Sequence, residues 1–155
     1  MDRKGQATVE FALTALLLFA LVFAIIDLAV MFYVNLTMQS AVREGTRYAI
    51  TGRKGDSTDR RTELINQIKI NSNGLYEKNA LRNDPTVSIL TPKMTNNFSN
   101  YSGHPVNDTG NPDQIIIVSL TYGWPLLTPT LKPFFAGGVY KFTVRATMKN
   151  EPWEP

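Results

Sequence analysis

Residues 11–34 read FALTALLLFALVFAIIDLAVMFYV, and this stretch decides the fold class. It is apolar apart from Thr14 and Asp27. Because a helix rises about 1.5 Å per residue, these 24 residues would span roughly 36 Å, more than the ~30 Å hydrocarbon core of a bilayer. The sequence therefore predicts a membrane-spanning helix. The main alternative is a cleaved secretory signal, but the apolar run of such a signal is usually only about 7–15 residues long.

Length and composition limit what the rest of the chain can do. The chain has 155 residues, no cysteine and a net charge of +3. Outside the apolar segment, roughly 130 residues can build a small two-layer core, which excludes a large catalytic domain. The lack of cysteine excludes disulfides, a thiolate nucleophile and cysteine-ligated metal sites. The mild positive charge does not by itself indicate a class of partner.

The chain also lacks the usual signatures of catalysis. Its one histidine is His104, and no phosphate-binding loop, nucleophile elbow or dinucleotide fingerprint is present. The acidic segment 107–113 lacks the ligand spacing of an EF-hand, so an Asx-type turn is a simpler interpretation than a calcium site. We therefore expect no enzymatic activity, no cofactor and no metal ion.

Two acidic residues are unusual for a plain membrane anchor. Glu10 stands at the start of the apolar run and Asp27 lies inside it. An ionised carboxylate in lipid costs several kcal/mol and therefore needs a partner. Glu10 either reaches water at the headgroup level or pairs with a cation. Asp27 either stays protonated or reaches the far interface, or it receives a donor from another chain in a helical assembly.

The residues before Glu10 form a recognisable arrangement. A short basic leader, Met1–Gly5, precedes Gln6, and Glu10-Phe11 open the apolar run. This order resembles the class III signal of type IV pilins and pseudopilins, which prepilin peptidase cuts after a glycine. The resemblance implies a leader over residues 1–5, cleavage between Gly5 and Gln6, and pairing of Glu10 with the N-terminal amine of a neighbouring subunit. An unbranched glycine also allows the protease the closest approach to the backbone.

A second resemblance concerns residues 41–49, AVREGTRYA, which look like the helix end of TadE-like proteins of the tight-adherence (Flp) pilus system. Residues 144–153 are similar to the closing strand and tail of that family. The resemblance implies a bacterial inner-membrane subunit with an extracytoplasmic head that acts in pilus assembly and reaches a cell-surface pilus. Its partners would be prepilin peptidase, other pilin-like subunits and the membrane, without nucleic acid. The head is large beside the short major Flp subunits, which favours a minor or accessory role.

Beyond the membrane segment, the pattern predicts an α+β head. Apolar and small residues recur at helical spacing after Val34, and Gly52 can end the helix, so one helix is expected from about Thr8 to Thr51 within residues 6–52. In the head, residues 53–155, Thr58 or Asp59 could cap a short helix that carries Leu64, Ile65 and Ile68. Three strands with antiparallel pairing are predicted, at Thr86–Leu90, Ile115–Tyr122 and Val139–Met148.

Three parts of the head are candidate contact surfaces. The polar segment 91–114 is a candidate binding loop. Ile115 and Ile117 point to the second sheet face and could meet a partner. In the connection 124–138, proline should prevent strand pairing, and its apolar residues either close the core or form a subunit contact. These residues are Leu126, Leu127, Leu131, Phe134 and Phe135.

Basic residues cluster after the membrane segment. They either form a solvated face or contact anionic lipid or an acidic partner, and they are Arg43, Arg47, Arg53, Lys54, Arg60 and Arg61. They outnumber Arg3 and Lys4, so simple counting of positive charge would place the head in the cytoplasm, whereas the pilin resemblance requires the reverse. Two other functions remain open: an anchored module that binds a ligand through residues 91–114, and an anchored nucleic-acid binder with steep salt dependence.

Overall fold

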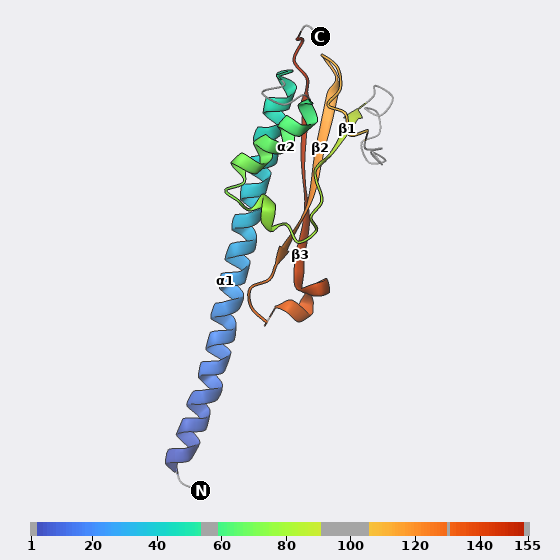
Figure 1. Cartoon of the computed structure of the whole chain (residues 1–155). Helices are drawn as coiled ribbons and strands as arrows, with labels where there is room; N and C mark the ends of the chain where they lie inside the picture. The colour runs from blue at the N-terminus through green and yellow to red at the C-terminus, as the bar shows by residue number, and fades with distance from the viewer. Residues whose placement is uncertain (1–2, 54–58, 91–105, 130, 154–155) are drawn as a thin grey trace.

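The computed structural model describes residues 3–53, 59–90, 106–129 and 131–153. Helix α1 (Arg3–Ile50) runs the whole length of the molecule, and its N-terminal half projects from the head (Figure 1). The helix begins at Arg3, five residues before the predicted Thr8, and therefore includes part of the segment predicted as a leader. The head adds α2 (Arg60–Asn71), the short 3-10 helix η1 (Tyr76–Lys78) and three strands. The predicted α+β architecture is confirmed.

The C-terminal half of α1 carries the predicted packing stripe. Met38, Ala41 and Val42 are fully buried, and Val34, Gly45 and Ala49 lie on the same face. Thr46 interrupts this stripe with a hydroxyl, but its Oγ1 donates to the carbonyl of Val42 at 2.7 Å, which satisfies the buried polar group. The helix is therefore amphipathic only where the head covers it.

Helix α2 packs closely against α1 at Gly45. A Cβ atom at this position would lie 2.5 Å from Cγ1 of Ile68 and 3.2 Å from the carbonyl oxygen of Leu64. Glycine is therefore required by the close approach of the two helices. The predicted cap is also present, since the side chain of Asp59 accepts a hydrogen bond from the amide of Arg61 at 3.2 Å.

Within the described residues, the strands form one antiparallel sheet in the order β1-β2-β3: β1 (Thr86–Leu90), β2 (Ile115–Pro125) and β3 (Val139–Lys149). The three predicted strands are confirmed. The prediction that proline keeps the connection 124–138 out of strand pairing was wrong at one position, because Pro125 is the last residue of β2 and lies opposite Val139. Pro125 lacks an N–H, and the hairpin closes one residue later, where the amide of Leu126 donates to the carbonyl of Gly138 at 3.0 Å.

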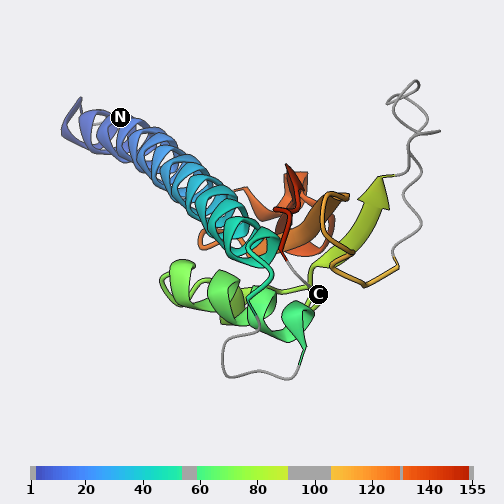
Figure 2. The same cartoon turned by 90° about the horizontal axis from the view of Figure 1, so that it is seen from above.

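Both helices cover the same face of the sheet (Figure 2). The core between these layers contains Ile116, Val118, Leu120 and Tyr122 of β2, as predicted, together with Val144 of β3. On the opposite face Ile117 is only 6% exposed, so the prediction that it offers a free apolar surface was wrong. Alternation along the strand located its face correctly but could not show what covers it.

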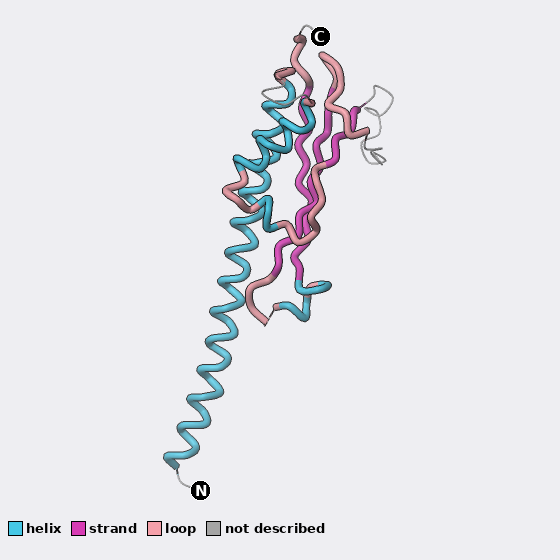
Figure 3. The backbone as a smooth tube through the Cα atoms, in the orientation of Figure 1, coloured by secondary structure: helices cyan, strands magenta, loops and turns pink. Residues whose placement is uncertain are grey.

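The connection between β2 and β3 forms a separate tip at the end of the sheet nearest the N-terminus of α1 (Figure 3). We call residues 126–138 the hairpin tip. It contains two short 3-10 helices, η3 (Lys132–Phe134) and η4 (Ala136–Gly138). Leu126 is buried, but Leu127 and Phe134 are 57% and 80% exposed. The five apolar residues of this connection therefore do not act together as a core lid.

Candidate functional site

The N-terminal half of α1 presents apolar side chains on all sides. None of residues 5–26 is buried, and exposed leucines and phenylalanines surround the helix. These residues extend for roughly 33 Å at the usual helical rise, which matches the hydrocarbon core of a bilayer. A segment in α1 is long and apolar enough to cross a membrane. The chain is therefore membrane-anchored through α1.

Glu10 lies on this exposed segment. Its Oε1 accepts a hydrogen bond from Nε2 of Gln6 at 3.1 Å, and its carbonyl accepts one from Oγ1 of Thr14 at 2.8 Å. The Gln6 amide is neutral, so this hydrogen bond does not offset the charge of the carboxylate. A cation that approached from outside the chain could reach Glu10, because the side chain is exposed.

Gly5 lies in the first turns of α1, where glycine has no role in the fold. A Cβ atom at this position would have no atom within 4 Å. Glycine in a helix costs roughly 0.5–1 kcal/mol relative to alanine, so an unneeded glycine is a local disadvantage. Gly5 differs in this respect from Gly45, which the packing of the two helices requires.

Asp27 has a partner within its own chain. It is 2% exposed, and its Oδ2 accepts hydrogen bonds from the backbone amide of Thr128, at 3.2 Å, and from the Thr128 hydroxyl. The two residues are far apart in the sequence, and the contact joins the hairpin tip to α1. A donor from another chain is thus not needed to satisfy this carboxyl, and a role of Asp27 in assembly stays a prediction.

The head approaches α1 from Asp27 onward. Met31 and Val34 are also buried, and Nδ2 of Asn35 lies 3.4 Å from the hydroxyl of Tyr140. The C-terminal third of the predicted membrane segment, residues 11–34, therefore has one side against the head. Its other side remains exposed through Leu28, Phe32, Tyr33 and Leu36.

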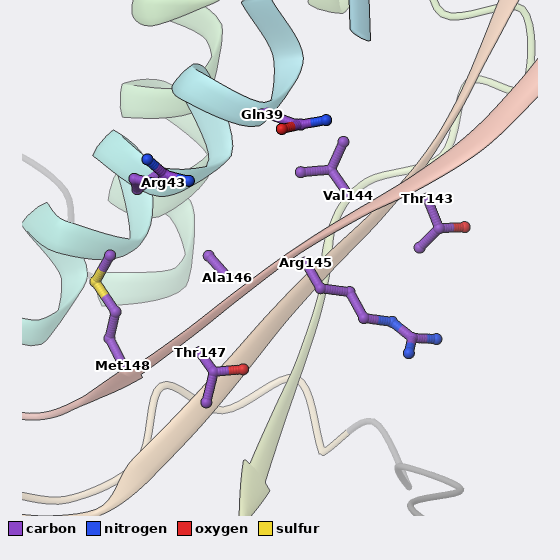
Figure 4. Close-up of a pocket in the computed structure, with 8 residues that line it drawn as sticks. All are labelled: Gln39, Arg43, Thr143, Val144, Arg145, Ala146, Thr147 and Met148. Atoms are coloured by element: carbon purple, nitrogen blue, oxygen red, sulfur yellow. The ribbon is translucent and has the colours of Figure 1, made fainter. Parts of the chain in front are cut away.

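A groove of about 390 Å³ lies between α1 and the edge strand β3. Figure 4 shows Val144 and Ala146 turned toward the helix, whereas Thr143, Arg145 and Thr147 turn away from it. Arg43 and Gln39 line the groove from α1. Arg43 is the member of the predicted basic cluster that reaches a concave surface.

Comparison with known proteins shows what the long helix is similar to. Residues 5–47 match the model of the TadE-like protein family. Over this segment the chain is similar to TadE-like proteins. The resemblance noted in the sequence is confirmed over residues 5–47, and this similarity associates the chain with pilin-like proteins of the Tad pilus system. The similarity at residues 144–153 lies outside the matched range. No curated protein and no solved structure matches the chain significantly.

The described residues of the predicted basic cluster do not share one face. Arg47 is exposed beside Glu44, at 3.9 Å, and Arg53 is exposed. Arg61 donates to the carbonyl of Pro85 at 3.4 Å. Lys54 lies outside the described residues.

Arg60 contacts the interior of the head. Its guanidinium donates to the carbonyls of Gly110, at 2.7 Å, and of Ala49 and Thr109, both at 3.2 Å. It also lies 4.4 Å from the ring centre of Trp153. Burial lowers the pKa of Arg60, an effect that nearby Asp108 and Asp59 oppose, and the side chain keeps its charge.

The other candidate sites give a mixed result. Residues 91–105 of the predicted binding loop, with His104, lie outside the described residues. In the acidic turn, Oδ1 of Asp108 accepts from the amide of Gly110 at 3.1 Å, which is the predicted Asx geometry, and Asp113 pairs with Lys149 at 2.7 Å. Among the described residues, no group of three His, Asp or Glu side chains is placed to hold a metal ion.

Sequence reasoning missed two connections. It identified Asp27 but not Thr128 as its donor, and it did not anticipate that Arg60 would lie over Trp153. The only available signal was a polar residue in an apolar run, which indicates that a partner is needed but not where it comes from.

Proposed function

We propose that this TadE-like protein is a subunit of the Tad pilus machinery, acting as a minor pilin or structural component after prepilin peptidase removes residues 1–5. Assembly would transfer the exposed half of α1 from lipid to a bundle of similar helices. The observation that carries this proposal is the exposed apolar surface of residues 5–26 with one carboxylate, Glu10, at its start. A plain anchor needs the apolar surface but has no use for the carboxylate.

Pairing of Glu10 with a mature N-terminal amine would supply specificity. In lipid, a charged carboxylate and a charged amine stabilise each other far more than in water, because the effective dielectric constant is low. A second subunit whose N-terminal amine pairs with Glu10 would therefore be favoured at one axial position relative to the first helix. This pairing would set the register between neighbouring helices.

Cleavage between Gly5 and Gln6 would supply that amine. The open space around Gly5 supports this role, since a protease can approach the backbone there and the fold itself gains nothing from glycine. The proposed domain arrangement is thus a leader over residues 1–5, the long helix over 6–52 and the head over 53–155.

We also propose an extracytoplasmic head. If the membrane span ends near Asp27, Arg43 lies more than a dozen residues beyond it, near the limit of about 15–20 residues over which basic residues control orientation. Arg3 and Lys4 lie directly at the other end. The basic residues that count most then lie on the cytoplasmic side.

The test is replacement of Glu10 by glutamine, which keeps the shape of the side chain and removes its charge. We expect Glu10→Gln to lower recovery of the subunit in the sheared pilus fraction by about tenfold or more, equivalent to roughly 1.4 kcal/mol of assembly free energy. Membrane insertion and head folding should not change. Glu44→Gln is the matched control, because Glu44 is an exposed acid on the same helix. Wild-type recovery of Glu10→Gln would remove the proposed role of this carboxylate.

A further inference from the structure

The hairpin tip lies beside α1 at the level where the helix stops being exposed on all sides and one of its sides begins to pack against the head. The contact between Asp27 and Thr128 fixes this position, and Asp27 is the first buried residue after the exposed segment 5–26. Figure 1 shows the tip as the part of the head that reaches farthest toward the N-terminus of α1. A bilayer around residues 5–26 would therefore have its surface at the tip.

The composition of the tip suits the surface of a bilayer. Residues 126–138 contain no Asp or Glu, and their only charged residue is Lys132. Leu127 and Phe134 are largely exposed, and Lys132 and Pro133 lie next to Phe134 at the surface. Exposed apolar side chains with a neighbouring cation are typical of segments that enter the headgroup region of a membrane.

The described residues of the tip are also joined by their own contacts. Besides the bond from Leu126 to Gly138, the amide of Phe134 donates to the carbonyl of Leu131 at 3.0 Å. Phe135 packs edge to face on Tyr140, and both line a cavity of about 170 Å³ with residues of α1. Phe134 is therefore held outward while its neighbour Phe135 faces the helix.

We propose that the hairpin tip is a second membrane-contacting element, which inserts Leu127 and Phe134 into the interfacial layer of the bilayer around α1. Lys132 then lies at the level of the lipid phosphates. The head would be seated on the membrane at two points, the helix and the tip, and its height would be set by the contact between Asp27 and Thr128. This inference needs only a membrane-spanning α1 and does not depend on pilus assembly.

Because the chain lacks cysteine, single cysteine variants can report depth in the bilayer. The full chain carries a nitroxide at Phe134→Cys and is placed in phosphatidylcholine vesicles at low protein density. The measurement is the ratio of nitroxide collisions with oxygen, which is concentrated in lipid, to collisions with a water-soluble nickel chelate. Ala12→Cys on the exposed apolar helix is the lipid reference, and Thr121→Cys on the outer face of β2 is the water reference.

We expect the ratio at Phe134 to exceed that at Thr121 by several-fold and to lie below that at Ala12. A ratio equal to that at Thr121 would overturn the proposal, because the tip would then be in water. Protection from both reagents, with spin–spin broadening that disappears on dilution by unlabelled chain, would also overturn it. In that case a second copy of the chain would cover the tip.

Discussion

At the scale of single residues, two glycines of α1 lie in opposite surroundings. Gly45 allows α2 to approach, whereas Gly5 has empty space where a side chain would be. Helical periodicity alone does not separate them, because both lie in helical stretches. The structure distinguishes a glycine that the packing of two helices requires from one that has no packing role.

This contrast gives a prediction with a built-in control. Gly5→Val should leave the head as stable as the wild type, because the added side chain meets nothing, but it should reduce removal of the leader. Gly45→Ala should do the reverse: overpacking against Ile68 should cost about 1–3 kcal/mol of unfolding free energy and leave processing intact. Thermal unfolding and the intact mass of each variant measure the two effects. Normal processing of Gly5→Val would count against the assigned cleavage site.

At the scale of elements, α1 combines two different patterns in one helix. Its first half is apolar on all sides and its second half is amphipathic, and both patterns are readable from the sequence because helical periodicity is local. The strand bounds follow for the same reason from alternation and turn residues. The position of the hairpin tip does not follow, because the contact between Asp27 and Thr128 joins residues 101 positions apart.

The tip contact can be weakened without changing side-chain shape. Thr128→Val removes the hydroxyl that donates to Asp27 and leaves a buried carboxylate less satisfied, at a cost of about 1–3 kcal/mol. We expect amide exchange at Leu126 and Gly138 to accelerate by about tenfold or more. Thr121→Val, an exposed threonine bonded to Thr143 at 3.1 Å, is the control and should not change exchange in the tip. Unchanged exchange in Thr128→Val would show that the tip does not depend on this bond.

At the scale of the whole molecule, Arg60 joins three segments at the end of the head away from the membrane. It contacts the end of α1 at Ala49, the turn at Thr109 and Gly110, and the C-terminal Trp153. Trp153 in turn lies against Gly52, where a Cβ atom would be 2.5 Å from its ring. The C-terminal segment is thereby fastened to the end of the long helix.

Arg60→Met tests this junction. Loss of three charge-assisted hydrogen bonds and of the stacking on Trp153 should lower the unfolding free energy of the head by about 2–3 kcal/mol. Arg47→Met, at an exposed and weakly paired arginine, should change it by less than about 0.5 kcal/mol. Denaturation in detergent, followed by tryptophan fluorescence, compares the two. Equal stabilities would mean that Arg60 is a surface residue in solution.

Some residues of the candidate site could be proposed from a local sequence pattern, whereas others depend on contacts between distant parts of the chain. Gly5, Gln6 and Glu10 could be proposed from the sequence because their order along the chain resembles the class III signal of pilins, which is a local pattern. The basic cluster could not be assigned correctly as one surface, because Arg60 and Arg61 are engaged by carbonyl groups of the head while Arg43 faces a groove. The charge of a residue does not show whether its side chain forms hydrogen bonds within the head or remains exposed to solvent.

The central claim is that the chain is processed as a pilin-like subunit, and its intact mass tests this most directly. The protein is purified from its native membrane, from cells with active prepilin peptidase and from cells without it. We predict that the active peptidase removes Met1–Gly5, so that the mature chain begins at Gln6. A full-length N-terminus in both samples would contradict the account, and Glu10 would then be only a carboxylate at the membrane surface.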